Sequence, residues 1–564
     1  MKPACWPFLL VLSAVATAAP RGGDPTFSIV FSKNLNGETE PCGCLSDIQG
    51  GLARRSQIVA DLRKTGRPVL HVDSGDVFFK KPKQGLPKML ELWDQTPGLR
   101  NYMTAAFQLT AEAIVDSYNL MGVDAICPGE RDFMLGVEFL DQLRKRAKFP
   151  FVCANVYPKG EKGERKKKDP VFTPWIVKEL GGVKVVIVGV ATDWLYDDFP
   201  HIAGKRFEDA FWIEDPVDYL ERMKGTLRAQ GDLVVVLSHM GVNEDLTFSR
   251  HGSKDVVDFM IGSCTPNVWD QAYKHERANP IRIYHPPEQG KGVGLIDFTW
   301  LGPKKSLFDL TDIDLKVKKL GLVRAALESD QQARKVHEAE PRPPDEKAKI
   351  LEAMDRQLAE KETVIRRLES ETAVTTEDYN LLRYKMVDME TSLPEEAAVK
   401  KRLDELKSAL TALVTAWKES DRKAGAGDEQ YQKYAGQETC RGCHTGQHDF
   451  WSQTKHAHAM ETLEKVIQAV NPECIGCHSL GFREEGGFQR PYNASRFANV
   501  QCEHCHGPRA EHVKNPLKSA KSPPVTAEAC KPCHASAGPK FDFASAIKTA
   551  GCPPELSFKK PEKK

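Results

Sequence analysis

After its N-terminal stretch, the sequence contains no run of about 18 consecutive apolar residues, the length that a membrane-spanning helix needs. It also lacks an excess of either charge. Its formal net charge is +1, so neither a nucleic acid nor an anionic membrane surface is expected as a partner. With 41% hydrophobic and 28% charged residues over 564 positions, the composition is that of a globular protein of several domains. We therefore expect a mature chain without a transmembrane segment.

The first 18 residues have the pattern of an export signal. Lys2 supplies a positive charge, Phe8–Ala16 is apolar but too short to span a membrane, and Ala16-Thr17-Ala18 is a cleavage site of small residues. We expect a signal peptide over residues 1–18 that is cleaved near Ala18, and a periplasmic or otherwise exported mature protein. An uncleaved anchor is the alternative.

Eight of the 15 cysteines belong to four Cys-x-x-Cys-His motifs in the C-terminal part. Two cysteines three positions apart lie on one turn and can bond to both vinyl groups of a haem, and the next residue points its imidazole at the iron. Paired Cys-x-x-Cys units also bind zinc, but a zinc site needs no histidine after every second cysteine. We expect four c-type haems with these histidines as proximal ligands. The motifs are Cys440-Arg-Gly-Cys443-His444, Cys474-Ile-Gly-Cys477-His478, Cys502-Glu-His-Cys505-His506 and Cys530-Lys-Pro-Cys533-His534.

A low-spin haem needs a second axial ligand, and the same region has spare histidines. We expect His456, His458 and His512 as candidate distal ligands of the haem irons. His456 and His458 are two positions apart and face different directions on a helix, so they can serve different haems. His512 follows a turn-rich stretch that can fold back over a neighbouring haem. For each of them, an ordinary surface position is the alternative.

Four stretches around these motifs carry a family pattern. They are Tyr434-Ala-Gly before Cys440, Trp451 before His456-Ala-His458-Ala, Cys477-His478-Ser-Leu-Gly-Phe482, and Cys502-Glu-His-Cys505-His506-Gly-Pro before His512. Over residues 431–535 they resemble the tetrahaem cytochromes of the hydroxylamine-oxidation pathway. The resemblance implies closely stacked haems, mostly with two histidine ligands, and electron exchange with redox partner proteins. We expect a mainly helical or irregular tetrahaem cytochrome c domain at residues 431–540.

Residues 325–422 are highly charged, low in glycine and free of cysteine, unlike both flanks. Leu351–Leu368 and Val399–Trp417 each repeat apolar residues at spacings of three and four, although Lys361 interrupts the first seam. Thr375 can cap a middle helix between the two seams. We expect a helical coiled-coil linker whose two seams pair as a hairpin. A dimer through the coiled coil is the alternative.

Residues 26–300 alternate apolar strand candidates with helix-like segments, which predicts an α/β domain. Most candidates are rich in valine and isoleucine without alternation, which indicates burial on both faces. Functional residues of such sheets follow the carboxyl ends of the strands. The strand candidates are Phe27–Ser32, Pro68–Val72, Ala125–Cys127, Phe151–Asn155, Val183–Val190, Leu233–Ser238 and Val257–Ile261.

Polar segments follow these strand candidates in a recognisable order. They are Asn34-Leu-Asn36, Asp73-Ser-Gly75-Asp76, Gly129-Glu130-Arg131-Asp132, Ser238-His239 and Gly262-Ser-Cys264. The order resembles the periplasmic 5′-nucleotidase and UDP-sugar hydrolase branch of the metallophosphoesterases, which implies a layered α/β sandwich over about residues 26–300 and a pair of divalent metals.

Matched residue by residue, this chain keeps only part of that family's metal site. Asp76 and His239 are retained, whereas asparagines stand in the first motif, and Glu130 and Arg131 stand in the third. A neutral asparagine cannot replace the charge of aspartate on a hard cation, and arginine is not a ligand. We expect a residual or altered site for one divalent metal at Asp76, His239 and Cys264, and no ordinary dinuclear hydrolase.

A cysteine pair follows the altered first motif, in Pro41-Cys42-Gly-Cys44. Cys42 and Cys44 form a hypothetical redox pair, or a thiolate metal site with Cys264 and His239. A structural disulfide or buried inert thiols are the alternatives. The loop is similar to that of nucleotidase-like bacterial proteins in which selenocysteine can replace a cysteine, which implies redox chemistry rather than hydrolysis. Cys127 and Cys153 lie in apolar strands and are expected in the core.

These motifs favour a periplasmic multihaem c-type cytochrome in electron transfer, whose nucleotidase-like domain carries a thiol redox site or a thiolate metal site. The alternative is a metal-dependent phosphoesterase with an attached cytochrome domain. A third reading is a scaffold whose first domain only binds a partner. The sequence favours an oxidoreductase role over phosphohydrolase activity and leaves open whether the chain is an enzyme.

Overall fold

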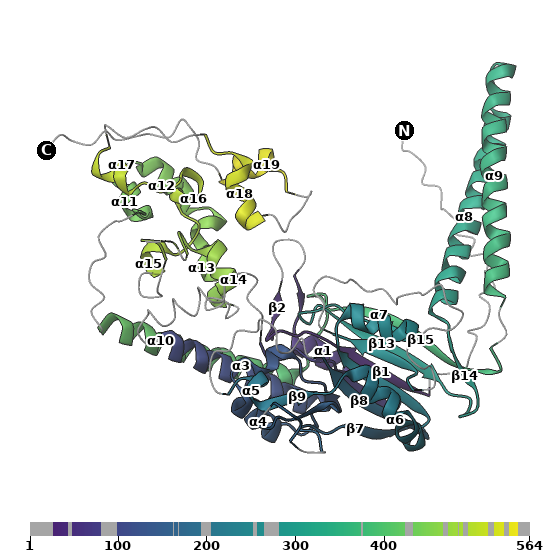
Figure 1. Cartoon of the computed structure of the whole chain (residues 1–564). Coiled ribbons are helices and arrows are strands. Elements are labelled where there is room, and N and C mark those ends of the chain that lie inside the picture. Colours follow the sequence, from purple (N-terminus) through teal and green to yellow (C-terminus); the bar gives the residue numbers. More distant parts are fainter. Residues whose placement is uncertain are drawn as a thin grey trace. The chain divides into compact units, whose positions relative to one another are not determined.

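The computed structural model describes residues 26–42, 48–79, 99–161, 163–166, 169–192, 205–251, 256–263, 281–373, 376–423, 433–465, 472–482, 484, 486–488, 494–516, 524–534 and 541–550. The predicted signal peptide, Cys44 and Cys264 lie outside these residues, and so does the side chain of Cys42. Figure 1 shows an α/β part, a pair of long helices and a group of short C-terminal helices. Among the helices described, none is long and apolar enough to cross a membrane.

Two β-sheets form the centre of the α/β part. The first has the strand order β14-β15-β13-β1-β4-β5, and the second has the order β12-β11-β10-β8-β7. In the second sheet β8, β10, β11 and β12 pair in parallel, and in the first sheet β4 and β5 do the same. The first sheet contains β1 (Phe27–Ser32), β4 (Val69–Asp73), β5 (Ala125–Ile126), β13 (Gly292–Thr299), β14 (Ser306–Asp309) and β15 (Tyr379–Asp388). The second contains β7 (Trp175–Leu180), β8 (Val183–Ala191), β10 (Leu233–His239), β11 (Phe259–Gly262) and β12 (Arg282–Tyr284).

The α/β class expected from the sequence is confirmed. Every residue of β10, with the sequence LVVVLSH, is buried, as expected of a strand that is covered on both faces. The aromatic ring of Phe31 in the first sheet packs against that of Tyr284 in the second, with ring centroids 6.0 Å apart. One strand prediction is wrong in detail, because Phe151–Asn155 forms only isolated bridges there, from Phe151 to Ile126 and from Val152 to Thr173.

Helices flank these sheets and follow ordinary local signals. The helix α6 (Pro216–Gln230) begins after Asp215, whose side chain accepts hydrogen bonds from the backbone N–H groups of Val217 and Asp218. Tyr219, Leu220 and Leu227 of α6 pack with the valines of β10 in one buried cluster. The other helices of this part include α1 (Leu52–Lys64), α3 (Leu99–Met121), α4 (Val137–Arg146) and α7 (Val242–His251).

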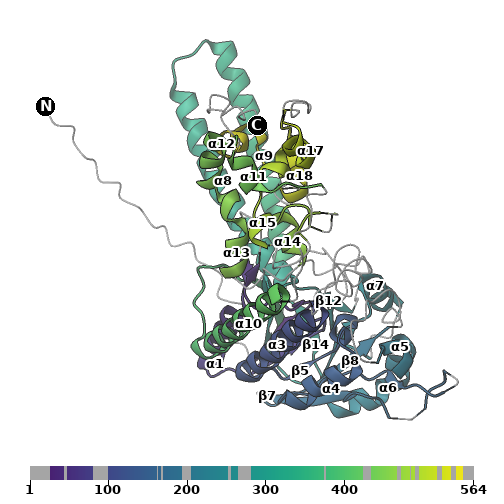
Figure 2. The same ribbon diagram turned by 90° about the vertical axis from the view of Figure 1, so that its left-hand side faces the viewer.

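The two apolar seams of the expected linker do not pair with each other. The second seam lies on α10 (Ala397–Lys423), and its Leu406 and Leu410 are buried against Ala106 and Ala113 of α3. Figure 2 shows α10 alongside α3. Small alanines on α3 let the leucines of α10 approach closely, so the partner of this seam is a helix of the α/β part.

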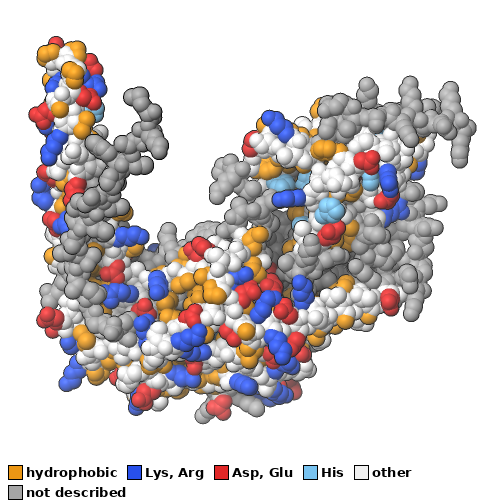
Figure 3. All heavy atoms as spheres, turned by 180° about the vertical axis from the view of Figure 1, so that it is seen from behind, with side chains coloured by type: hydrophobic (Ala, Val, Ile, Leu, Met, Phe, Trp, Pro, Cys, Tyr) orange, Lys and Arg blue, Asp and Glu red, His pale blue; other side chains and the backbone are white. Residues whose placement is uncertain are grey.

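The first seam pairs with a helix that the sequence analysis did not predict as an element of its own. It lies on α9 (Pro344–Thr372), which packs against α8 (Thr311–Ala339) as a helical pair joined by a proline-containing turn. Ion pairs join the two helices, among them Arg334 with Asp355, at 2.5 Å between Nε and Oδ1. Lys361, which interrupts the seam, pairs with Asp330 of α8. Figure 3 shows both signs of charge along this pair, as on a solvated helical hairpin.

The middle helix expected after Thr375 is also wrong. Residues Tyr379–Asp388 instead form the strand β15, in which Asn380, Leu381 and Leu382 are buried. The helical pair and most of this strand belong to a compact unit that contains residues 295–385. The boundaries of the linker and of the other domains remain predictions.

The C-terminal part consists of short helices around a small apolar cluster. Tyr434, Met460, Leu463, Leu480 and Phe497 are among its buried members. The helices are α11 (Gln437–Arg441), α12 (Thr445–Ser452), α13 (Ala459–Lys465), α14 (Pro472–His478), α15 (Ala494–Phe497), α16 (Cys502–His506), α17 (Ala510–Lys514), α18 (Ala527–His534) and α19 (Phe543–Ala550), and η3 (Lys455–His458) is a short 3-10 helix. So small a core leaves much of the fold to other contacts, which suits a domain built around prosthetic groups.

Candidate functional sites

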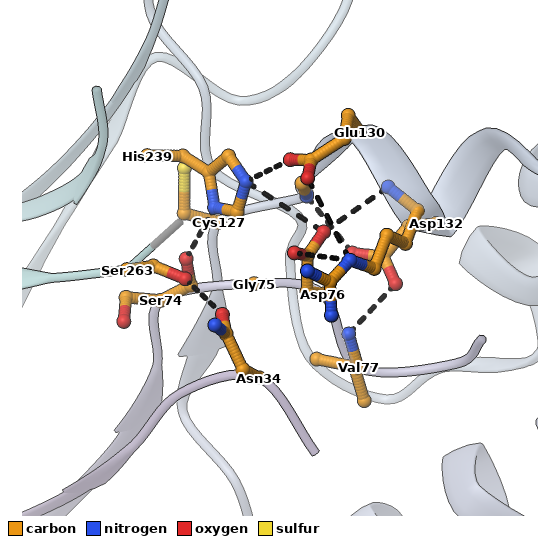
Figure 4. A network of polar contacts seen from close by, with 12 residues as sticks. Asn34, Ser74, Gly75, Asp76, Val77, Cys127, Glu130, Asp132, His239 and Ser263 are labelled. Carbon is orange, nitrogen blue, oxygen red and sulfur yellow. Dashed lines mark hydrogen bonds and ion pairs between the residues drawn. The ribbon is translucent and has the colours of Figure 1, made fainter. Parts of the chain in front are cut away.

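The first candidate site lies where β1, β4, β5 and β10 end (Figure 4). Three residues of these loops that are not glycine have a left-handed backbone, with φ of 45° at Asn34, 57° at Asn36 and 55° at Asp76. Asparagine and aspartate tolerate this region best, and such strained positions concentrate at functional sites. The loops therefore hold these three residues in a backbone conformation that is unfavourable for most other residues.

Asp76, Glu130 and His239 come together in this site. Each offers a ligand atom, and these atoms all lie within 4.8 Å of one another. The Nε2 atom of His239 is 2.5 Å from Oε2 of Glu130 and 3.6 Å from Oδ1 of Asp76. The structure thus brings together the predicted pair of Asp76 and His239, and it adds Glu130, which the sequence comparison counted only as a lost ligand.

The environment shifts the pKa values of the two carboxylates of this cluster in opposite directions. Burial, and then the neighbouring charge of Glu130, raise the pKa of Asp76 to about 6. Burial would also raise the pKa of Glu130, but the charge and hydrogen bond of His239, together with Arg131, lower it below its usual range. The negative charge of the pair is therefore best stabilised on Glu130, beside the imidazole.

Arg131 closes the other side of the cluster. Its Nε atom lies 3.2 Å from Oδ2 of Asp76 and 3.6 Å from Oε1 of Glu130. Its Nη1 atom donates a hydrogen bond of 2.5 Å to Oδ1 of Asn36. Arg131 therefore holds together the asparagine of the first motif and the aspartate of the second.

Two glycines make room for this arrangement. A Cβ atom at Gly129 would lie 2.3 Å from Oδ1 of Asp76 and 2.4 Å from Cε1 of His239. A Cβ atom at Gly75, where φ is +107°, would lie 2.4 Å from the carbonyl oxygen of Cys127. Neither position has space for a side chain without displacing the cluster.

The cysteines of this part have different outcomes. Cys127 and Cys153 are fully buried free thiols, which agrees with their expected place in the core. Burial raises the pKa of the Cys127 thiol well above its usual value, and contact with Cys153 adds to the shift. Cys42 belongs to β2 (Pro41–Cys42), which pairs with β3 (Gln49–Gly50), but the thiols of Cys42, Cys44 and Cys264 lie outside the described residues. The proposed thiol site therefore stays a prediction.

The second candidate site is the set of Cys-x-x-Cys-His motifs. Each motif lies on or beside a short helix, namely α11, α14, α16 or α18, and its two cysteines are partly exposed. The neighbouring thiol of Cys502 lowers the pKa of Cys440, and the thiol of Cys477 lies 3.9 Å from the carbonyl oxygen of Pro532 in the fourth motif. The first motif thus adjoins the third, and the second adjoins the fourth. Figure 3 shows histidine side chains at the surface of this part.

Two pairs of histidines face each other across these motifs. The ring centroids of His444 and His512 are 6.3 Å apart, and those of His456 and His534 are also 6.3 Å apart. A histidine nitrogen binds a metal at roughly 2 Å, so two imidazoles on opposite sides of one ion have ring centroids about 6 Å apart. Burial, and then the partner His512 or His534, lower the pKa of His444 and of His456. Both therefore favour the neutral form that a metal ligand requires.

The remaining histidines have other partners. His458 is half exposed, and its ring nitrogens face Oε1 of Glu461 and the carbonyl oxygen of Ser452. His504 is held by the backbone of Ser479 and Gln501. Of the three predicted distal ligands, His456 and His512 thus lie opposite proximal histidines of the motifs, whereas the ring nitrogens of His458 contact Glu461 and Ser452.

A buried carboxylate ties the third motif to the start of this part. The side chain of Glu503 accepts hydrogen bonds from the backbone N–H groups of Ala435 at 3.0 Å, Gly436 at 2.8 Å and Arg509 at 2.6 Å. Glu503 is the residue between Cys502 and His504 in the motif itself, and it is 3% exposed. It therefore fixes the orientation of the motif within the C-terminal part.

Comparisons with known proteins divide the chain in the same way. Residues 439–507 match the model of the family described as cytochrome c554 and c-prime. Cytochrome c-554 of Nitrosomonas europaea is 31% identical over 108 residues, which cover 16% of this chain and 46% of that protein. Protein UshA of Escherichia coli is 25% identical over 302 residues, 48% of each chain.

A solved structure and the curated relatives complete this comparison. The crystal structure of a 5′-nucleotidase precursor from Thermus thermophilus covers 68% of this chain and 59% of its own, with 19% identity and a TM-score of 0.42. The chain spans about half the length of the curated relatives it matches. The C-terminal part of this protein resembles cytochrome c554, and its N-terminal part resembles the 5′-nucleotidases of the metallophosphoesterase group.

Proposed function

We propose that this protein is an exported multihaem c-type cytochrome that transfers electrons through four haems in its C-terminal part. One observation carries the proposal. Two proximal histidines of the Cys-x-x-Cys-His motifs, His444 and His534, each face a second histidine at a ring distance that suits one metal ion between them. The likeness to cytochrome c554 over residues 439–507 supports it from a separate direction.

The residues of the chain divide the work of holding the haems. The eight motif cysteines attach the porphyrins, and the four motif histidines supply proximal nitrogens. A haem with two neutral imidazoles supplies a one-electron centre whose charge changes without loss of a ligand. Glu503 orients the third motif, and the contacts of Cys440 with Cys502 and of Cys477 with Cys533 support close pairs of haems. Such pairs allow electrons to pass between centres before a redox partner protein takes them.

The test of this function is haem-specific. The chain is expressed with a haem-maturation system, exported, purified and titrated with a chemical reductant while its visible spectrum is followed. We expect reversible reduction of several haems per chain and re-oxidation by an external acceptor. A haem-loaded protein that the reductant does not reduce, or that the acceptor does not re-oxidise, would contradict the proposal.

A phosphoesterase is the second candidate, and Asp76, Glu130 and His239 favour it. This candidate requires metal-dependent release of phosphate from nucleotides that Asp76→Asn and His239→Asn both abolish. The thiol redox site that the sequence predicts at Cys42 and Cys44 is tested on its own by the double variant Cys42→Ser with Cys44→Ser, which should change redox turnover with a partner. Unchanged turnover in that double variant would remove the thiols from the account.

A further inference from the structure

The tautomer of His239 is fixed by its neighbours. The Nδ1 atom lies 3.0 Å from the carbonyl oxygen of Ser74, which can only accept a hydrogen bond, so Nδ1 carries a proton and donates it. In a neutral imidazole, Nε2 then holds a lone pair. That lone pair faces the carboxylates of Glu130 and Asp76 (Figure 4). These groups converge, and a positive charge between them, either the second proton of an imidazolium or a metal ion, stabilises this arrangement.

The same contact is the usual support of a metal-binding histidine. Histidines that bind metals donate their other ring N–H to a carboxylate or a backbone carbonyl group, which orients the ring. In addition, Oδ2 of Asp76 is fully buried and accepts no hydrogen bond from the described residues, and its ion-pair partner is Nε of Arg131 at 3.2 Å. Two carboxylates and one imidazole suit a divalent ion of intermediate hardness, such as Mn²⁺ or Zn²⁺.

Arg131 determines how many such ions the cluster can hold. In two-metal sites, the ions lie roughly 3.5–4 Å apart and share a ligand between them. Asp76 is placed for that role, because its Oδ1 faces His239 and its Oδ2 faces away toward Arg131. The second position, between Asp76 and Asn36, is filled by the guanidinium group of Arg131, which contacts both side chains.

We propose that Asp76, Glu130 and His239 bind a single divalent cation, and that Arg131 acts as a built-in second cation that excludes another metal. The arrangement departs from the dinuclear site that the resemblance implies. Two negative carboxylates then face three positive charges, two on the metal and one on Arg131. The site therefore keeps one net positive charge, which one further anion on the metal, such as hydroxide or an oxyanion, would neutralise.

Metal stoichiometry tests this site in the full, haem-loaded chain. The protein is stripped with a chelator, dialysed against Mn²⁺ or Zn²⁺ and measured by mass spectrometry of the elements, with haem iron as the internal count of chains. We expect about one Mn²⁺ or Zn²⁺ per chain. Glu130→Gln should weaken binding tenfold or more, whereas the matched control Glu405→Gln, at an exposed position of α10, should bind as the wild type does. Absence of bound metal in the wild type would overturn the metal site.

A gain of stoichiometry tests the role of Arg131 and does not depend on a variant that loses function. Arg131→His replaces the guanidinium group by a ligand next to Asn36 and Oδ2 of Asp76, and it should raise the content to about two ions per chain. A value that stays at one, or a wild type that already binds two, would overturn the role of Arg131. The haem spectrum of each sample is recorded separately, so failure of this site is distinguishable from failure of the electron-transfer proposal.

Discussion

The imidazole rings of His444 and His512 lie 6.3 Å apart between centroids, with their planes inclined by 41°. Residue 444 closes the first Cys-x-x-Cys-His motif and residue 512 lies on α17, so the approach of the two rings depends on the fold of the whole C-terminal part. The separation suits one iron between them, and it gives the ligand assignment a direct test.

Replacement of His512 by alanine should convert one haem from low-spin to high-spin, because its iron loses the distal nitrogen. We expect a high-spin ferric signal in the electron paramagnetic resonance spectrum that corresponds to about one haem per chain. The matched control is His458→Ala in the same C-terminal part. This substitution removes an imidazole that is hydrogen-bonded to Glu461 and to the carbonyl oxygen of Ser452. An equal change in the control, or none in His512→Ala, would refute the pairing.

Glu503→Gln should destabilise the C-terminal part by about 2 kcal/mol. The substitution keeps the shape of the side chain but removes the negative charge that receives three backbone N–H groups, and hydrogen bonds to charged groups are worth about 1.5–3 kcal/mol. Thermal unfolding followed in the haem absorption band measures the effect. Glu511→Gln, at a carboxylate 76% exposed, is the control and should leave the midpoint unchanged. Equal midpoints for Glu503→Gln and the wild type would show that the buried carboxylate is dispensable.

Much of this C-terminal part could be predicted because its chemistry is local in the sequence. The four motifs, and the expectation that each ends in a proximal histidine, follow from the spacing of cysteine and histidine alone. The distal ligands could not be chosen in this way. His456 and His458 are two residues apart, and only the fold turns the first toward His534 and leaves the second at the surface.

Gly129→Ala should destabilise the α/β part by about 1–3 kcal/mol, as overpacking of a tight core does, because the new methyl group overlaps Asp76 and His239. Far-UV circular dichroism during heating measures the change. Gly225→Ala is the matched control. Position 225 lies within α6, and a Cβ atom there meets no atom within 4 Å, so alanine should stabilise the helix by about 0.5–1 kcal/mol. Similar effects of the two substitutions would contradict the geometry of the site.

His71 should make the stability of the α/β part depend on pH. Burial, and then the positive charges of Arg55 and Arg63, hold the pKa of His71 well below its usual range, and Nε2 accepts a hydrogen bond of 3.1 Å from Nε of Arg55. The unfolded chain takes up a proton near pH 6.5, whereas the folded chain does not. The contribution of His71 is therefore fully present above pH 6.5 and is lost progressively as the pH falls toward the folded pKa.

His71→Gln removes that proton from the balance. Below pH 6.5, the stability of the variant should depend less steeply on pH, by up to about 1.4 kcal/mol per pH unit. The thermal midpoints of the wild type and the variant, measured from pH 7.5 to pH 5.0, give the two slopes. Parallel curves would mean that His71 is not held neutral in the folded protein.

The sequence predicts the fold class of the α/β part but not its tertiary contacts. Runs of valine and isoleucine such as β8 and β10 are signals of buried strands, so the architecture follows from the sequence. The pairing of the helical seams does not, since Leu406 and Leu410 meet alanines on α3 that carry no seam of their own. Glu130 was missed for a similar reason. Compared with the family motif it looks like a lost ligand, and only the fold, which brings its Oε2 to 2.5 Å from Nε2 of His239, makes it a candidate ligand.

The most direct test of the whole account is the number of haems on the purified mature chain. Pyridine haemochrome absorbance, together with the intact mass under denaturing conditions, counts the porphyrins that are covalently attached. We predict four per chain, each lost when the two cysteines of its motif are replaced by serine. A colourless protein, or a chain whose mass shows no added haem after export through a competent maturation system, would contradict the account.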